Sequence, residues 1–174
     1  HWTNVKVWKD GPNKGRVKSV RFFMFKTQEA IPYEIQNLTA AEEINIFSNA
    51  NTFLLSLDTG EYITKLTDLK RLTIGSYGLV TLHPDFVNLK NLEYLDLGSN
   101  CFEELPDILT PENFPNLKSL SLNNSRITQS AKDLSKITKG DSIGLYLKSS
   151  VDGKDNPLRK LLLWEKLEEL DISN

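Results

Sequence analysis

The sequence of 174 residues is short of the residues on which several classes of protein depend. A single cysteine excludes an internal disulfide scaffold and a metal site built from several cysteines. The 21 lysine and arginine residues are balanced by 23 aspartate and glutamate residues, so bulk charge predicts no nucleic-acid partner. Apolar runs are only a few residues long, as at 161–164, which is too short to span a membrane.

The sequence does contain an internal repeat, and a repeat decides the fold before any single residue does. In residues 92–100, apolar side chains occupy positions 1, 4 and 6, and asparagine occupies position 9. The residue three places before each repeat, from the second repeat on, is also apolar in every case. The spacing of 23 to 28 residues is regular enough to predict a stacked array. The repeats begin at residues 17, 41, 69, 92, 117, 140 and 167.

This pattern is similar to that of leucine-rich repeat proteins, whose repeats are about 20–29 residues long. The segment 31–39 resembles the proline-containing convex segment of plant-type repeats, and 83–86 and 105–108 are shorter versions of it. The resemblance covers nearly the whole chain, from Arg16 to Asn174.

The N-terminal stretch is similar to the cap of the plant proteins. Residues 2–7 and 15–17 carry this resemblance, but the two cysteines of the plant pattern are missing. That departure favours a bacterial relative, of the kind found on the surface of Bacteroidetes, with a cap that lacks the disulfide. The resemblance implies a cap over residues 1–16 and repeats over residues 17–174.

The repeat predicts an α/β solenoid of about seven coils, with a parallel concave sheet and a mostly irregular convex side. Positions 4 and 6 face inward because side chains alternate along a strand, and they are buried only by stacking on neighbouring coils. We expect extra loops at 50–65 and 149–158 and a helical turn at 131–137. Terminal repeats need a polar cap, so we expect more coils after Asn174. The first residue is not methionine, so we expect any targeting segment to have been removed or omitted.

Nothing in the sequence supports catalysis. Cys101 and His83 belong to different sides of the coil, whereas a nucleophile and its base must be in hydrogen-bond contact. Phosphate-binding loops and nucleophile-elbow motifs are absent from the sequence. The sequence therefore predicts no enzyme, no cofactor and no metal site.

The outward positions of the strands carry the functional prediction. Gly75 and Gly98 lie on this face, and we expect their lack of side chains to let a ligand approach the backbone. Hydrogen-bonding and aromatic residues surround them between the third and sixth coils. The predicted ligand-binding residues of the concave face are Arg71, Thr73, Tyr94, Asp96, Asn123 and Tyr146.

Two other outward groups have a structural alternative. Phe23, Met24 and Phe47 form an apolar patch that either packs under the cap, against Trp2 or Trp8, or belongs to the binding face. Position 2 alternates in charge from coil to coil, which is typical of pairing between adjacent strands. Its residues are Lys18, Glu42, Lys70, Glu93, Lys118, Asp141 and Glu168.

These observations favour a non-catalytic recognition module that binds a protein or glycan through the concave face. The alternative is a structural spacer or targeting region of a larger cell-surface protein. We expect a monomer with no nucleic-acid partner and no membrane span. We also expect an extracellular or cell-surface location, with a bacterial outer-membrane lipoprotein as the favoured form.

Overall fold

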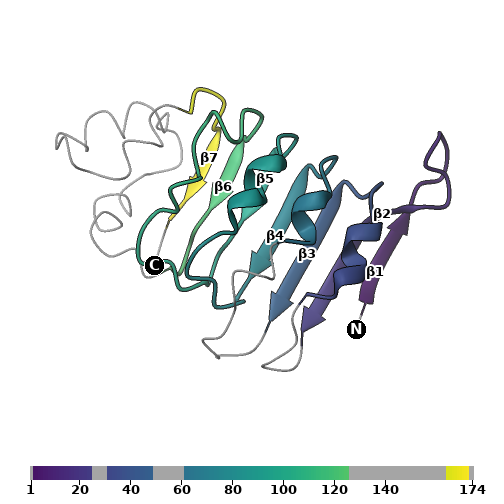
Figure 1. Cartoon of the computed structure of the whole chain (residues 1–174), viewed down its shortest axis with the longest axis horizontal. Coiled ribbons are helices and arrows are strands. Elements are labelled where there is room, and N and C mark those ends of the chain that lie inside the picture. The colour runs from purple at the N-terminus through teal and green to yellow at the C-terminus, as the bar shows by residue number, and fades with distance from the viewer. Residues whose placement is uncertain (1, 25–30, 49–60, 126–163, 173–174) are drawn as a thin grey trace.

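A computed structural model of the chain describes residues 2–24, 31–48, 61–125 and 164–172. Seven strands form one sheet and follow one another across it in sequence order (Figure 1). β1 pairs antiparallel with β2, and every later pair is parallel. The strands are β1 (Trp2–Val7), β2 (Val17–Met24), β3 (Glu43–Ser48), β4 (Arg71–Gly75), β5 (Tyr94–Asp96), β6 (Ser119–Ser121) and β7 (Glu169–Asp171).

The parallel strands are aligned by their inward residues. Position 4 of each repeat pairs directly with position 4 of the next strand, from β2 to β7. Five of these side chains are at most 1% exposed, and the last is partly buried. The stack of apolar residues therefore fixes the register and confirms the predicted solenoid. The aligned residues are Val20, Ile44, Leu72, Leu95, Leu120 and Leu170.

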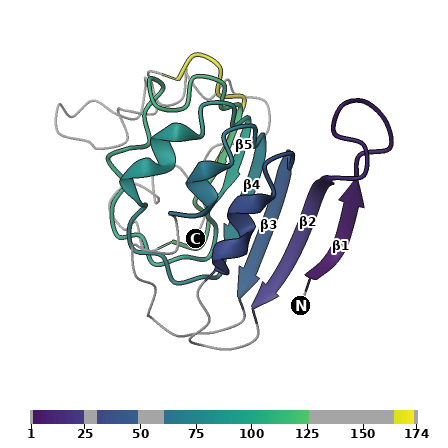
Figure 2. The same ribbon diagram turned by 45° about the vertical axis from the view of Figure 1, so that its right-hand side comes forward.

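Short 3-10 helices lie on one side of the sheet only (Figure 2). They are η1 (Tyr33–Asn37), η3 (Ile63–Lys65) and η4 (Pro84–Asn88). Pro84 begins η4, and the His83 side chain accepts a hydrogen bond from the backbone N–H of Asp85 at 3.1 Å. The expected loop at 50–65 therefore ends in a 3-10 turn, while its residues up to 60 lie outside the described part.

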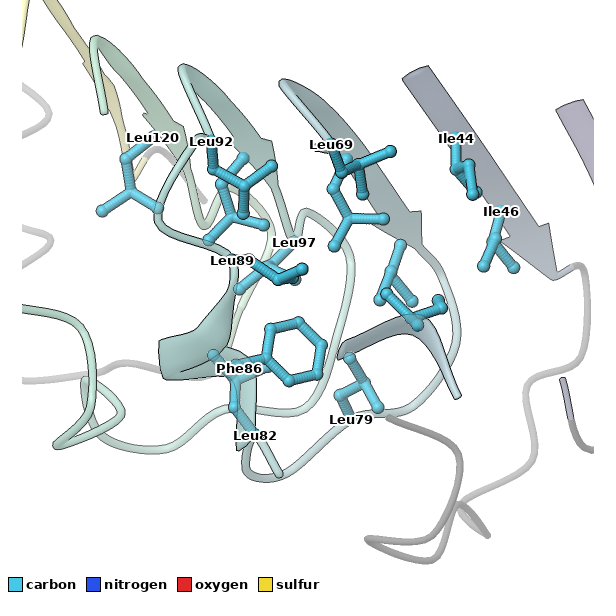
Figure 3. Packing of buried hydrophobic residues seen from close by; sticks show 14 of the residues in the cluster. Ile44, Ile46, Leu69, Leu79, Leu82, Phe86, Leu89, Leu92, Leu97 and Leu120 are labelled. Carbon is cyan, nitrogen blue, oxygen red and sulfur yellow. The ribbon is translucent and has the colours of Figure 1, made fainter. Parts of the chain in front are cut away.

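The core lies between these turns and the strands. Phe86 of η4 points toward the strand residues, with Leu82 and Leu89 beside it (Figure 3). All three are at most 5% exposed. Trp164 is 6% exposed and its Nε1 donates to the carbonyl of Phe114 at 3.2 Å, which places it in the core. The expected helical turn at 131–137 and loop at 149–158 lie outside the described residues.

Asn100, at position 9 of its repeat, organises the turn after β5. Its buried amide accepts from the backbone N–H groups of Tyr77 and Leu79 at 3.0 and 3.1 Å. The same amide donates to the carbonyls of Ile74 and Leu97 at 2.7 and 2.8 Å. It therefore satisfies buried backbone groups in its own coil and in the coil before it.

β6 pairs directly with β7 in the sheet, with Leu120 opposite Leu170. The coil expected to start at residue 140 falls within residues 126–163. Residues 126–163 themselves lie outside the described part of the chain.

The N-terminal segment forms a β-hairpin at the edge of the sheet. β1 has two register irregularities against β2, and Asn4 has a φ of +52°. Gly11 and Gly15 adopt positive φ values of 72° and 82° in the turn, which glycine tolerates without strain. The turn also fixes Trp8, whose Nε1 donates to the carbonyl of Ala40 at 2.9 Å.

Candidate functional site

The face of the sheet opposite the 3-10 turns is where the ligand-binding residues were predicted. It is formed by the outward positions 3, 5 and 7 of the repeats, and we call it the open face. In Figures 1 and 2 the coiled turns all lie on the other side. At position 5 this face carries Arg21, Asn45, Thr73, Asp96, Ser121 and Asp171.

Arg71 and Tyr94 meet at the centre of the open face. They are register partners on β4 and β5, and the Arg71 guanidinium carbon lies 4.3 Å from the centre of the Tyr94 ring. This is a cation–π contact, and it orders two side chains that would otherwise be flexible. Arg71 is exposed and Tyr94 half-buried, so both present surface to a ligand.

Asp96 lies on the same strand as Tyr94 and acts on its electrostatics. Burial raises the pKa of the Tyr94 phenol, and the negative charge of Asp96 raises it further, so the phenol stays protonated as a donor. The Asp96 carboxylate also accepts the backbone N–H of Gly98 at 2.9 Å. Thr73, its register partner, is only 4% exposed and offers almost no surface to a ligand.

The two glycines do not open the floor of the face as expected. A Cβ atom on Gly75 would lie 3.2 Å from the Phe47 ring, and one on Gly98 would overlap the Asn123 amide. Both glycines are buried. The space left by the missing side chains is therefore filled by residues of neighbouring strands, and the backbone is not available to a ligand.

Aromatic residues occupy the N-terminal part of the open face. Phe23 and Phe47 stack with ring centroids 5.8 Å apart, and Arg21 lies 5.6 Å from the Phe47 ring. Phe23 retains 37% of its surface. Trp8, one of the expected cap partners, donates a hydrogen bond to the carbonyl of Ala40. The side chains of Trp2 and Met24 lie outside the described part.

Acidic residues of β7 extend the site beyond the predicted set. Glu169 accepts a hydrogen bond from the Ser119 hydroxyl at 2.9 Å, and Asp171 accepts one from the Asn123 amide at 2.9 Å. Both acids occupy outward positions of the seventh repeat, so the pattern could have found them. They were missed because the predicted site was confined to the third to sixth coils. Tyr146, the remaining predicted residue, lies outside the described part.

The alternating charges at position 2 form ion pairs between coils. Glu42 lies 3.6 Å from Lys18 and 2.6 Å from Lys70, and Glu93 lies 2.7 Å from Lys118. The hydrogen bond from Lys70 lowers the pKa of Glu42, and that from Lys118 lowers the pKa of Glu93. These side chains therefore pair with one another, as the alternation indicated.

A groove of about 730 Å³ lies beside the hairpin and was not anticipated from the sequence. We call it the N-terminal groove. It is lined by the end of β1, the hairpin turn and the first residues of β2 to β4, and Arg71 links it to the open face. No repeat pattern in the sequence indicates it, because β1 and the turn lie outside the repeat. Its principal lining residues are Lys6, Trp8, Lys9, Ser19, Glu43 and Arg71.

Metal-binding clusters and membrane-spanning helices are both absent from the described residues. These residues contain no group of three or more His, Cys, Asp or Glu side chains that could hold a metal ion. Within the same residues, no helix is long and apolar enough to cross a membrane. Cys101 is a free, half-buried thiol, and the His83 Nδ1 atom is engaged in capping η4.

The sheet, the aligned apolar columns and the asparagine turn define a leucine-rich repeat solenoid. Its structure is similar to that of a leucine-rich repeat protein from Leptospira interrogans, with a TM-score of 0.53 and 21% identity, over 90% of this chain and 37% of that one. An internalin from Listeria monocytogenes gives a TM-score of 0.43 and 15% identity, over 88% of this chain and 48% of that one. The chain thus spans less than half the length of either protein.

The likeness to these structures extends to the fold alone. No protein-family model matches the sequence, and no curated protein matches it. The function therefore has to be argued from the residues of the site.

Proposed function

We propose that this chain is a non-catalytic recognition module that binds a protein through the open face of the solenoid. The observation that carries the proposal is the Arg71–Tyr94 stack at the centre of that face. Arginine and tyrosine are over-represented among residues that dominate binding energy. Here each restrains the other, so less conformational entropy is lost when a ligand binds.

The rest of the open face supports a protein ligand over a small molecule. Phe23 and Phe47 supply a second aromatic group on β2 and β3, while Glu169 and Asp171 supply acceptors on β7. Groups on five of the six strands from β2 to β7 suit a broad partner surface. Rigid strands also hold these side chains more accurately than loops would.

The proposal includes a location outside the cell or on its surface, with a bacterial outer-membrane lipoprotein as the favoured form. The resemblance of residues 2–7 and 15–17 to the cap of plant leucine-rich repeat proteins, without its two cysteines, supports this. A role as a spacer or targeting region would require only a rigid sheet and would make no use of Arg71 or Tyr94.

The test is a screen against panels of bacterial surface proteins and host extracellular proteins, followed by affinity measurement for variants. We expect Tyr94→Ala to weaken binding of a hit at least tenfold, as truncation of a central aromatic residue typically does. The matched control is Tyr33→Ala, because Tyr33 is 58% exposed but lies on η1, on the other side of the sheet.

A loss of affinity in Tyr33→Ala but not in Tyr94→Ala would place the binding site on the convex side. If the folded parent protein gives no hit in the screen, the spacer role is favoured.

A further inference from the structure

We infer that the N-terminal groove is a second binding site and that its ligand is an acidic saccharide, a short glycan that carries carboxylates. The groove holds about 730 Å³, within the range of roughly 300–1,000 Å³ typical of small-molecule sites. It lies at the N-terminal ends of the strands and is distinct from the aromatic groups of the open face. Ser19, Glu43 and Arg71, at position 3 of their repeats, border both.

The charges of the groove favour an anion. Five basic and three acidic residues line it. Glu42 is shared between Lys18 and Lys70, so its charge is compensated within the groove wall. Lys6 and Lys9 are exposed and make no ion pair among the described residues. Their ammonium groups, with the Arg71 guanidinium, are therefore the cations available to a bound anion.

Trp8 gives the groove a fixed apolar surface. Its Nε1 donates to the carbonyl of Ala40 at 2.9 Å, and the Lys18 ammonium lies 4.0 Å from its ring centre. The indole is therefore positioned before a ligand arrives. A pyranose ring presents a face of C–H groups that packs on such an aromatic surface.

The acidic residues of the groove distinguish a saccharide from an acidic peptide. Asp10 and Glu43 can accept hydrogen bonds from sugar hydroxyls, which the side chains of a glutamate-rich peptide do not offer. Glu43 already accepts from the Asn45 amide at 2.9 Å, which holds its carboxylate in place. A ligand with several hydroxyls and few carboxylates matches this mixture of donors, acceptors and an aromatic ring.

The experiment titrates the 174-residue chain with trigalacturonate and, as the neutral counterpart, maltotriose, by isothermal calorimetry. We expect trigalacturonate to bind at least ten times more tightly than maltotriose. Lys9→Glu should weaken trigalacturonate binding about five- to tenfold, because it reverses a cation of the groove. Lys14→Glu makes the same charge change at an exposed position of the same turn, outside the groove, and should change binding less than twofold.

Equal binding of the two trisaccharides would overturn the inference, as would equal losses in Lys9→Glu and Lys14→Glu, which would indicate unspecific attraction. Tighter binding of a glutamate-rich hexapeptide would overturn the assignment to saccharides. Phe23→Ala, on the open face and outside the groove, should leave trigalacturonate binding unchanged. A loss in that variant would move the saccharide to the open face, so this site and the proposed protein site are tested separately.

Discussion

At the scale of single residues, the packing around Gly98 shows what a missing side chain does in this sheet. Asn123 occupies the space that a Cβ atom would need, and Asp96 Oδ1 would lie only 3.0 Å from that atom. Asn123 is itself held by a 2.9 Å hydrogen bond to Asp171. The missing side chain of Gly98 therefore leaves room for Asn123 and its hydrogen bond to Asp171. It does not expose the backbone to a ligand.

We expect Gly98→Ala to lower the free energy of unfolding by about 1–2 kcal/mol, because the methyl group displaces Asn123. In an Asn123→Ala background the same change should cost less than half as much, since the obstructing amide is gone. Urea denaturation of the parent, the two single variants and the double variant measures the coupling. Strictly additive effects would contradict the packing described for this glycine.

The same residues show where reading the sequence was sufficient and where it was not. The position of Gly98 on the outward face follows from side-chain alternation alone. Its role depends on Asn123, which is 25 residues away in the sequence and becomes its neighbour only through the strand register. Apart from the alternating charges of position 2, outward positions carry no periodic signal, so their contacts could not be predicted.

At the scale of elements, the ion pairs between position-2 residues connect neighbouring strands. Along the chain, these strands are joined only through a whole coil. Lys18 lies at the start of β2, Glu42 and Lys70 directly precede β3 and β4, and the three form a continuous series. The pKa of Glu42 is lowered from its ordinary value of 4.5, chiefly by the hydrogen bond from Lys70. The carboxylate therefore stays charged to a lower pH in the folded protein than in the unfolded chain.

The stabilisation from Glu42 should be fully present above pH 4.5 and lost as the pH falls through the lowered pKa. At pH 7 we expect Glu42→Gln to reduce the free energy of unfolding by about 0.5–1 kcal/mol, a small value because the lysines are half-exposed. As the pH falls from 4.5 toward 3, the difference in stability between variant and parent should shrink. The measurement is chemical denaturation at pH 7, 4.5 and 3, with Glu103→Gln as an exposed control that should show no such change.

A difference that persists unchanged at pH 3 would mean that the glutamine perturbs packing rather than charge. The alternation that predicted this series was readable from the sequence, because adjacent parallel strands place equal repeat positions side by side. The hairpin and its groove were not, since β1 lies outside the repeat and its side chains from Asn4 to Val7 are exposed.

At the scale of the whole molecule, the pairing of β6 with β7 sets the length of the sheet. Ser119 and Glu169 are 50 residues apart in the sequence but are direct partners across the two strands. Within the described residues, six coils contribute the parallel strands β2 to β7, and the N-terminal hairpin adds β1. The coil expected at residues 140–148 lies outside the described part.

A disulfide can test this pairing. In a Cys101→Ser background, Ser119→Cys combined with Glu169→Cys should form a disulfide under mild oxidation, because register partners lie about 5 Å apart. Tyr94→Cys with Glu169→Cys should not, because two strand spacings, about 10 Å, exceed the reach of the bond. Mass spectrometry of the oxidised proteins distinguishes the outcomes. Failure of the first pair would support a coil between β6 and β7.

The irregular outer strand has a consequence for association between molecules. A straight, regular edge strand offers a row of unpaired backbone groups that a second chain can extend into a continuous sheet. β1 interrupts that row, because Asn4 has a left-handed backbone conformation and the register against β2 shifts twice. The strand also carries the charged residue Lys6. Polymerisation through this edge is thereby disfavoured even at high protein concentration, and the protein can present an extended, unobstructed face while remaining dispersed.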